Sequence, residues 1–415
     1  MVIVDTTALQ PRANYPAEWR EMSFDDFATL KRGKDLTREH FRSGTVPVAG
    51  SNGVIGYHDT ANVKAPGVTV GRSGSVGKVS FFEEDYWAHN TALFVADFHG
   101  NDPRFAGYFL RFLKLGRFGS GVSVPTLDRN VFRALPVVVP ILSEQQKIAS
   151  VLGLVQRAIE QQERLTELTQ ELKKSLMHKL FTEGLRGERQ KQTGIDAMPE
   201  SWKVKLLRDC CLVQTGIAKG RKVEASEALI LPYLRVANVQ AGHLDLSEMK
   251  TITIRRKEKD RYMLRKGDVV LTEGGDFDKL GRGFIWDSEI EDCIHQNHIF
   301  AVRVDRSQLL PEFFAHLSQS PYGKAYFLSV AHKTTNLACI NTTKLKGFPV
   351  LIPTLTEQEE IVRMLGVVNA KLAHHVRKEQ SLSDLFRTLL HQLMTAQIRI
   401  HDLDLSFLEQ DAVAS

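Results

Sequence analysis

The chain has 415 residues, of which 43% are hydrophobic and 25% are charged, with a formal net charge of +5. This composition excludes a largely disordered protein, and the length favours two or more domains, because single cores rarely grow past about 250–300 residues. The positive charge permits binding to a polyanion. The N-terminus lacks a signal-peptide pattern, no run of about 18 apolar residues exists, and the four cysteines lack metal-site spacing. We expect a cytoplasmic protein that binds no metal and spans no membrane.

The second half of the sequence repeats the first. A segment of the form Pro-x-x-x-Pro-x-x-x-Glu-Gln begins at Pro136 and returns 213 residues later at Pro349. A shorter Pro-x-x-Trp segment ends at Trp19 and returns 183 residues later at Trp202. The second copy therefore holds thirty more residues between these two landmarks (213 less 183). A repeat with matching ends and unequal middles indicates a duplicated scaffold that carries divergent globules.

The segment after each proline-rich motif has the pattern of a long amphipathic helix. Ser143 and Thr356 stand at N-cap positions, with Gln or Glu three residues on, as in a capping box. Apolar residues then recur at steps of mostly three and four, interrupted at equivalent places by Gln162 and His375. The pattern predicts coiled-coil helices, the first over 143–181 with a length of about 58 Å. The predicted coiled-coil core is Ile148, Leu152, Val155, Ile159, Leu172, Leu176, Leu180, Ile361, Leu365, Val368, Leu372, Leu385, Leu389 and Leu393.

The stretches before these helices have the pattern of mixed globules, so the predicted fold class is α+β. The predicted strands cover 67–70, 91–95, 269–271 and 299–303, and the predicted short helices 104–115 and 311–328. The predicted organisation is a first recognition domain at 1–134, a helical spacer at 135–182, a linker at 183–198, a second recognition domain at 199–347, a second spacer at 348–396 and a tail at 397–415.

Polar loops that contain glycine are the candidate binding surfaces of both globules. Glycine lets the backbone approach a partner closely; Arg suits guanine edges, Asn and Gln suit adenine edges, and Lys suits phosphates. For any single loop, an ordinary turn is an equally good interpretation. The candidate DNA-binding residues are Ser51, Asn52, Arg72, Ser73, Ser75 and Lys78 in the first globule, and Arg235, Asn238, Asp276, Lys279, Arg282, Gln296, Asn297 and Lys333 in the second.

Several other features have simpler interpretations. The loop 71–78 is no Walker A phosphate loop, because position 72 is Arg and Val79 follows the lysine. The charge run 251–261 is more often a solvated face than a phosphate contact, and Trp19 and Trp202 are more often packing residues at a domain entrance. Motifs of serine hydrolases, zinc proteases, dinucleotide-binding enzymes and amino-methyltransferases are missing, which favours a binding protein over an enzyme.

The doubled Pro-x-x-x-Pro-x-x-x-Glu-Gln motif, each copy opening a long helix, resembles the specificity subunit of type I restriction–modification enzymes. The entrances at Trp19 and Trp202 fit this family, as do the segments 51–53 and 74–77. The resemblance covers nearly the whole chain. It implies two target-recognition domains that each read one half of a split DNA site, and two helices that pack antiparallel as a spacer between them.

The resemblance also implies the partners. Modification subunits, expected as a pair, bind S-adenosylmethionine and methylate adenine; restriction subunits hydrolyse ATP with Mg²⁺ and cut DNA. The specificity subunit itself would bind no cofactor and catalyse no reaction. Because the two heads differ in sequence, we expect an asymmetric DNA site. Two alternatives remain open at this point: a coiled-coil adaptor that assembles proteins without DNA, and a stand-alone methyltransferase or nuclease with an unrecognised site.

Overall fold

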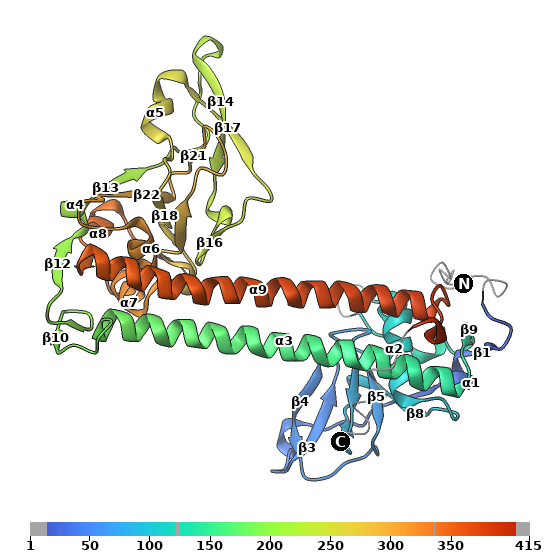
Figure 1. Ribbon diagram of the computed structural model, residues 1–415. Coiled ribbons are helices and arrows are strands. Elements are labelled where there is room, and N and C mark those ends of the chain that lie inside the picture. Colours follow the sequence, from blue (N-terminus) through green and yellow to red (C-terminus); the bar gives the residue numbers. More distant parts are fainter. Residues whose placement is uncertain (1–14, 122–124, 336, 404–415) are drawn as a thin grey trace. The chain divides into compact units, whose positions relative to one another are not determined.

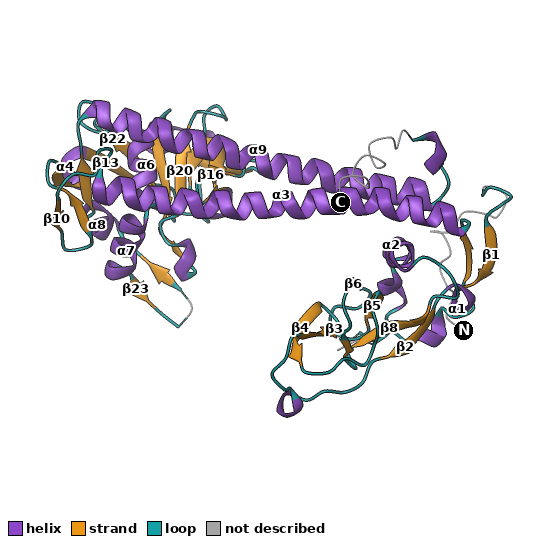
Figure 2. Ribbon diagram, turned by 60° about the horizontal axis from the view of Figure 1, so that its bottom comes forward, coloured by secondary structure: helices purple, strands orange, loops and turns teal. Residues whose placement is uncertain are grey.

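The computed structural model describes residues 15–121, 125–335 and 337–403. The chain forms two compact units, one of Met1–Glu163 with Arg377–Ser415, the other of Arg164–Val376. Each unit contains one globule and one half of each long helix (Figures 1 and 2). This differs from the sequential order of domains and spacers that the sequence predicts, because both helices run from one unit into the other.

The globule of the first unit is built on a four-stranded antiparallel sheet in the order β2-β8-β5-β6. A second sheet, β4-β3-β7, packs beside it, and β1 pairs with β9 at the entrance to the first long helix. Helix α2 covers the large sheet with a row of phenylalanines. The elements are β1 (Arg20–Ser23), α1 (Phe24–Phe27), β2 (Thr29–Arg32), β3 (Val46–Gly50), β4 (Gly53–His58), β5 (Gly67–Gly71), β6 (Val79–Phe82), β7 (Trp87–Ala88), β8 (Ala92–Asp97), α2 (Pro103–Leu113) and β9 (Pro136–Val139).

The globule of the second unit has the same plan with additions. Its sheet β13-β22-β18-β20 corresponds to the large sheet of the first, β17-β14-β21 to the second sheet, and β12-β25 to the entrance pair. The small sheet β15-β16 is an addition between β14 and β17, whereas β19-β24-β23 has a counterpart in the first unit in the isolated bridges Ser73–Thr126 and Ser120–Thr126.

The strands of the second unit are β10 (Gln190–Gln192), β11 (Ala197–Pro199), β12 (Lys203–Leu206), β13 (Cys211–Thr215), β14 (Ala228–Leu234), β15 (Val239–Gln240), β16 (His243–Leu244), β17 (Lys250–Arg255), β18 (Asp268–Thr272), β19 (Gly274–Gly275), β20 (Gly283–Trp286), β21 (Ile294–His295), β22 (Ile299–Val304), β23 (His332–Lys333), β24 (Ala338–Cys339) and β25 (Pro349–Ile352). Its short helices are α4 (Leu207–Cys210), α5 (Lys259–Tyr262), α6 (Pro311–Gln319), α7 (Pro321–Val330) and α8 (Thr342–Lys346).

The predicted strands and short helices are present, with one correction. The segment predicted as one helix over 311–328 is two helices, α6 and α7, which meet at Ser320. Pro321 causes the break, because proline lacks an N–H and disfavours a helical conformation in the residue before it. Ser320 then caps α7 by accepting a hydrogen bond from the N–H of Gly323 at 3.2 Å.

The two long helices are α3 (Leu142–Glu183) and α9 (Leu355–Met394). In the first unit the start of α3 packs against the end of α9, and in the second unit the end of α3 packs against the start of α9. The helices are therefore antiparallel, and the predicted α+β fold with a helical pair is confirmed. The predicted N-caps are wrong: both helices begin one residue before Ser143 and Thr356, and Thr354 accepts the hydrogen bond from the N–H of Glu357 at 3.3 Å.

The buried stripe of each long helix differs from the predicted one. Leu172 is 56% exposed and Leu385 is 44% exposed, so neither belongs to the core. The buried positions follow a strict heptad that passes through Gln162 and His375, which are 3% and 8% exposed. These two polar residues occupy the seam instead of interrupting it, and leucines one position off the heptad lie outside. Of the other predicted core residues, Ile148, Leu152, Val155, Ile159, Leu180, Ile361, Leu365 and Leu393 are buried, and Leu176, Val368, Leu372 and Leu389 are half-buried.

The repeated Trp and Glu form the same joint in each unit. The indole Nε1 of Trp19 donates to Glu144 Oε2 at 3.0 Å, and that of Trp202 donates to Glu357 Oε2 at 3.1 Å. Both indoles are buried, which makes a missing partner for the N–H costly. The carboxylate on the first turn of each long helix therefore fixes the entrance strand of its globule.

The repeated Gln ties the other short helix of each globule to the same place. Gln145 Oε1 accepts from the N–H of Asp102 at 2.9 Å, just before Pro103 opens α2. Its Nε2 donates to the carbonyl of Pro140 at 2.9 Å. Gln358 repeats this arrangement with the N–H of Leu310 at 2.8 Å and the carbonyl of Pro353 at 3.1 Å. Each Gln thus joins three segments by directional bonds.

We predict that Leu180→Ala lowers the stability of the chain by about 2–5 kcal/mol, because it opens a cavity in a packed core. Leu172→Ala, a matched change two turns away on the same helix, should alter stability by no more than about 0.5 kcal/mol. Thermal and denaturant unfolding of the full chain measure both. Equal losses from the two substitutions would contradict the heptad register described above.

Candidate nucleic-acid interface

The candidate loops of the first globule come together at one edge. Ser51 and Asn52 form the turn between β3 and β4, and Lys78 Nζ donates to the side-chain oxygen of Asn52 at 2.7 Å. A Cβ at Gly71 would collide with the carbonyl oxygens of Ser51 and Ser75, so only glycine permits this close approach of two loops. The sequence thus identified residues that the fold does assemble.

Two further candidates of this globule lie in the segment that follows β5. Arg72 and Ser73 follow β5 and are half-buried, and the backbone N–H of each donates to the carbonyl of Thr91. Arg72 Nη1 also lies 3.5 Å from the carbonyl oxygen of Asn90. Asn90 donates to Asp35 at 2.6 Å from the same edge. Asn90 is a further candidate that sequence reasoning missed, since an isolated Asn between strands carries no signal.

Strand β4 presents a second feature that the sequence did not reveal. Val54, Ile55 and Tyr57 are 50%, 48% and 58% exposed. An exposed apolar group next to polar loops suits contact with the methyl group of thymine. These side chains extend the candidate surface along the hairpin from its turn.

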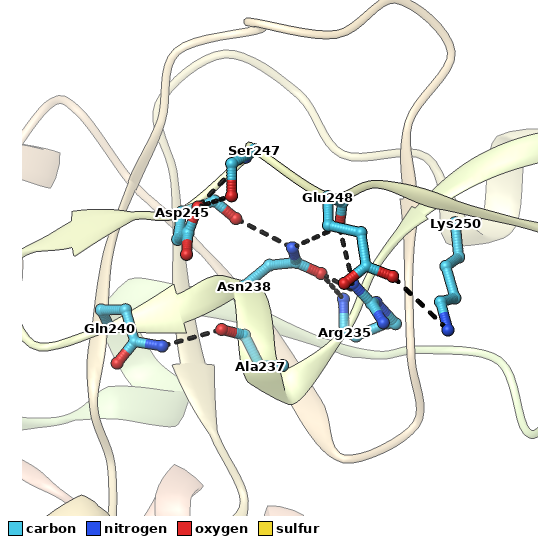
Figure 3. Close-up of polar contacts among 8 residues, drawn as sticks. All are labelled: Arg235, Ala237, Asn238, Gln240, Asp245, Ser247, Glu248 and Lys250. Carbon is cyan, nitrogen blue, oxygen red and sulfur yellow. Dashed lines mark hydrogen bonds and ion pairs between the residues drawn. The ribbon is translucent and has the colours of Figure 1, made fainter. Parts of the chain in front are cut away.

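Two candidates of the second globule are structural. Asn238 is buried, and its Oδ1 accepts from the N–H of Arg235 at 3.0 Å while its Nδ2 donates to the carbonyls of Asp245 and Glu248 (Figure 3). The Arg235 guanidinium donates to the same Glu248 carbonyl at 2.6 Å and to Asn238 Oδ1 at 3.2 Å. These bonds hold the loop between β14 and β17 in place. Both side chains thus have a structural role in this loop, and a contact of Arg235 or Asn238 with DNA stays a prediction.

Other candidates of the second globule gather around the loop that follows β18. Asp276 and Lys279 form an ion pair there, which lowers the pKa of the Asp276 carboxyl. Arg282 donates to Gln240 Oε1 at 2.9 Å, while its buried Nε has no hydrogen-bond partner among the described residues. With Nη1 bonded to Gln240, the Arg282 guanidinium still carries N–H donors that suit directional bonds to a partner.

The loop after β21 lies beside this one. Gln296 and Asn297 are half-buried, and His298 bonds to Glu273 Oε2 at 2.6 Å, immediately before β19. His295 anchors the loop from the core: burial lowers its pKa to about 4, so the ring stays neutral near pH 7. The fold thus brings Asp276, Lys279, Arg282, Gln296 and Asn297 into one region, with Lys333 exposed on β23 of the adjoining small sheet.

Among residues 15–121, 125–335 and 337–403, no cluster of His, Cys, Asp and Glu has the geometry of a metal site. No helix of that part of the chain is long and apolar enough to cross a membrane.

A family model decides between the remaining interpretations. The model of the type I restriction modification DNA specificity domain matches residues 16–170 and, a second time, residues 199–383. The chain belongs to this family. The two matches coincide with the two sequence repeats, and the identification of a specificity subunit is confirmed.

Curated relatives of this specificity subunit agree. The MjaVIII specificity subunit of Methanocaldococcus jannaschii is 25% identical over 71% of this chain and 68% of the relative. The EcoKI specificity subunit of Escherichia coli is 23% identical over 75% of this chain and 70% of the relative. The putative MjaX specificity subunit of Methanocaldococcus jannaschii is 22% identical, and the match spans 49% of that relative's length.

Solved structures show the same fold. The S subunit from M. genitalium is 18% identical with a TM-score of 0.59, and the match covers 93% of this chain and 98% of that one. A chain from a structure of the type I R-M system, concerned with complex assembly and conformational transition, gives a TM-score of 0.53 at 14% identity, covering 91% of this chain and 98% of that one.

We predict that Asn238→Ala destabilises the specificity subunit by about 1–3 kcal/mol, because it leaves buried backbone groups without partners. Asn297→Ala removes a half-buried amide and should leave stability within about 0.5 kcal/mol. Thermal unfolding compares the two. If Asn297→Ala were the more damaging change, the assignment of one Asn to structure and the other to the surface would be wrong.

Proposed function

We propose that this chain is the sequence-reading subunit of a type I restriction–modification complex and recognises a bipartite, asymmetric DNA site. The observation that carries the proposal is the repeated joint. One Trp–Glu bond and one Gln clamp hold each globule on a long helix, while the loops that the two globules carry differ in sequence and in length. A shared scaffold with different loops suits the reading of two different DNA words.

The chemistry of the loops supports this role. Lys78 and Lys279 suit phosphates, which position a protein on DNA. Arg282, Gln296 and Asn297 suit base edges, which specify sequence. S-adenosylmethionine, ATP and Mg²⁺ belong to partner subunits in this proposal, and the chain itself binds no cofactor and catalyses no reaction. It acts in the cytoplasm, where the host DNA lies.

The swap of one globule tests the proposal. We replace residues 16–140 with the corresponding segment of another family member, so that β1 and β9 are exchanged together and each keeps its partner strand. Sequencing of methylated host DNA should show that one half of the site changes while the other stays. A change in both halves, or in neither, would contradict modular reading.

The docking of modification subunits is the second part of the proposal. Leu165, Leu168 and Leu172 lie along the part of α3 in the second unit and are 44%, 42% and 56% exposed. Three leucines at steps of three and four form one stripe on a helix. An exposed apolar stripe marks a protein contact more often than a nucleic-acid contact. We assign this leucine stripe to contact with the modification subunit.

We predict that Leu168→Asp weakens assembly with the modification subunit by tenfold or more, because a buried, unpaired carboxylate costs well over about 1.4 kcal/mol. The matched control is Ile230→Asp, which alters an equally apolar residue that is 66% exposed on β14. Size-exclusion chromatography with light scattering measures the complex. Undiminished assembly of the Leu168→Asp variant would remove the stripe from the docking surface.

A further inference from the structure

Each unit has a groove at the same place in its fold. In both units the groove lies between the edge strand of the large sheet, the short helix held by the repeated Gln, and α3, and α9 also lines the second groove. Gly107, Tyr108 and Arg111 of α2 line the first groove, and the lining residues at the same distances from the opening proline of α6 are Ala315, His316 and Gln319. Gln156 of α3 in the first corresponds to Asn369 of α9 in the second. The volumes are about 530 and 410 Å³.

The first groove contains carboxylates beside its three arginines, Arg104, Arg111 and Arg157. Arg104 forms an ion pair with Glu83 at 2.6 Å, and Arg111 donates to Gln156 Oε1 at 3.2 Å. Glu160 supplies a second carboxylate to the lining. This groove therefore supplies two carboxylates as counter-charges to its own cations.

The second groove contains cations without carboxylates. Its charged lining residues are Lys173 and Lys174 of α3 and Lys324 of α7. The three side chains line the same groove, and burial, followed by the charge of Lys324, lowers the pKa of Lys173. His316 faces the same charge, and burial together with Lys173 lowers its pKa to about 4. Like charges that line one groove with no acid among the lining residues are unfavourable unless an anion joins them.

The groove adjoins the candidate DNA-binding loops of its own globule. Gly242, in the turn between β15 and β16, lines it, and a Cβ built there would lie 3.6 Å from Lys173 Nζ. The same small sheet holds Gln240, which accepts the hydrogen bond from Arg282. The lysines thus stand next to groups proposed to reach base edges, and phosphates flank the base edges of any duplex.

We propose that the groove formed by Lys173, Lys174 and Lys324 binds phosphates of the DNA backbone and holds the duplex irrespective of its sequence. This rests on the proposed function of the chain and adds a site to it. Phosphate oxygens supply the missing counter-charge to all three lysines. The first groove has two carboxylates among its lining residues and the second has none, so we expect the second unit to hold phosphates more strongly at this place.

The test is the salt dependence of DNA binding by the full chain, alone and assembled with its modification subunits. Lys173→Gln, Lys174→Gln and Lys324→Gln are compared singly and together on the target duplex and on a random duplex. Each lost phosphate contact should make the slope of log K against log salt less steep by about 0.9 and reduce affinity by roughly tenfold near 0.1 M salt. Both duplexes should lose affinity by the same factor.

Two controls keep the test decisive. Lys371→Gln removes an exposed lysine of α9 that does not line the groove, and its slope should match the wild type. Lys173→Met keeps the packing of the stem, so that thermal unfolding separates a folding defect from a lost contact. Binding to the random duplex requires no sequence recognition, so this measurement tests the groove independently of the proposed function.

Three results would overturn the proposal. One is an unchanged slope in the triple variant together with weaker assembly, which would assign the groove to an acidic segment of a modification subunit. Another is loss of binding to the target duplex alone, which would make these residues readers of sequence. The third is displacement of the random duplex by inorganic phosphate at constant ionic strength in the wild type but not in the triple variant, which would identify a small-anion site.

Discussion

The bond between each buried tryptophan and the glutamate of the first helical turn is the constraint on which the rest of the structure depends. A buried indole N–H needs an acceptor, and Glu144 and Glu357 supply it from the helix that follows. The neighbouring glutamine then fixes the start of a second helix from the same turn. In the first unit Arg399, which follows α9, pairs with Glu144 at 3.1 Å and with Glu18 at 2.6 Å, so the segment after the last long helix joins the same centre. The globule and the helix pair of each unit thus form one body.

This arrangement leaves the outer parts of each globule free to vary. The joint uses side chains at one edge of the globule and backbone groups that any sequence provides. The candidate loops connect or follow strands of the sheets, and buried residues fix the pairing of those strands. A loop can therefore change its residues, or acquire small sheets such as β15-β16, while the joint stays the same. The shared joint and the unequal loops together explain why the two repeat offsets differ by thirty residues.

The sequence predicted the elements well because periodic patterns report burial directly. The strands at 67–70 and 299–303 and the two long helices carry such patterns. It failed where several residue types compete for one role. Leu172 fits a pattern of leucines, yet the heptad passes one position away through polar residues. Arg235 and Asn238 have the chemistry of DNA contacts, but in the fold they also donate to loop carbonyls 7 to 13 residues away along the chain. Pairings of this kind are set by the fold and leave no local signal.

The polar residues in the helical seam explain why the leucines lie outside it. Gln162 and His375 stand at equivalent positions of the repeat and are buried, as is Thr169. A polar residue at a heptad position lowers stability but disfavours other registers, because a shifted helix would bury it against apolar groups. A seam made of leucines throughout would pack almost equally well after a shift of one heptad. In the proposed function, a helix pair shared by two recognition units requires one register, so the polar centre suits that role better than a stronger core would. The leucines excluded from the seam then remain available on the outer face for a partner.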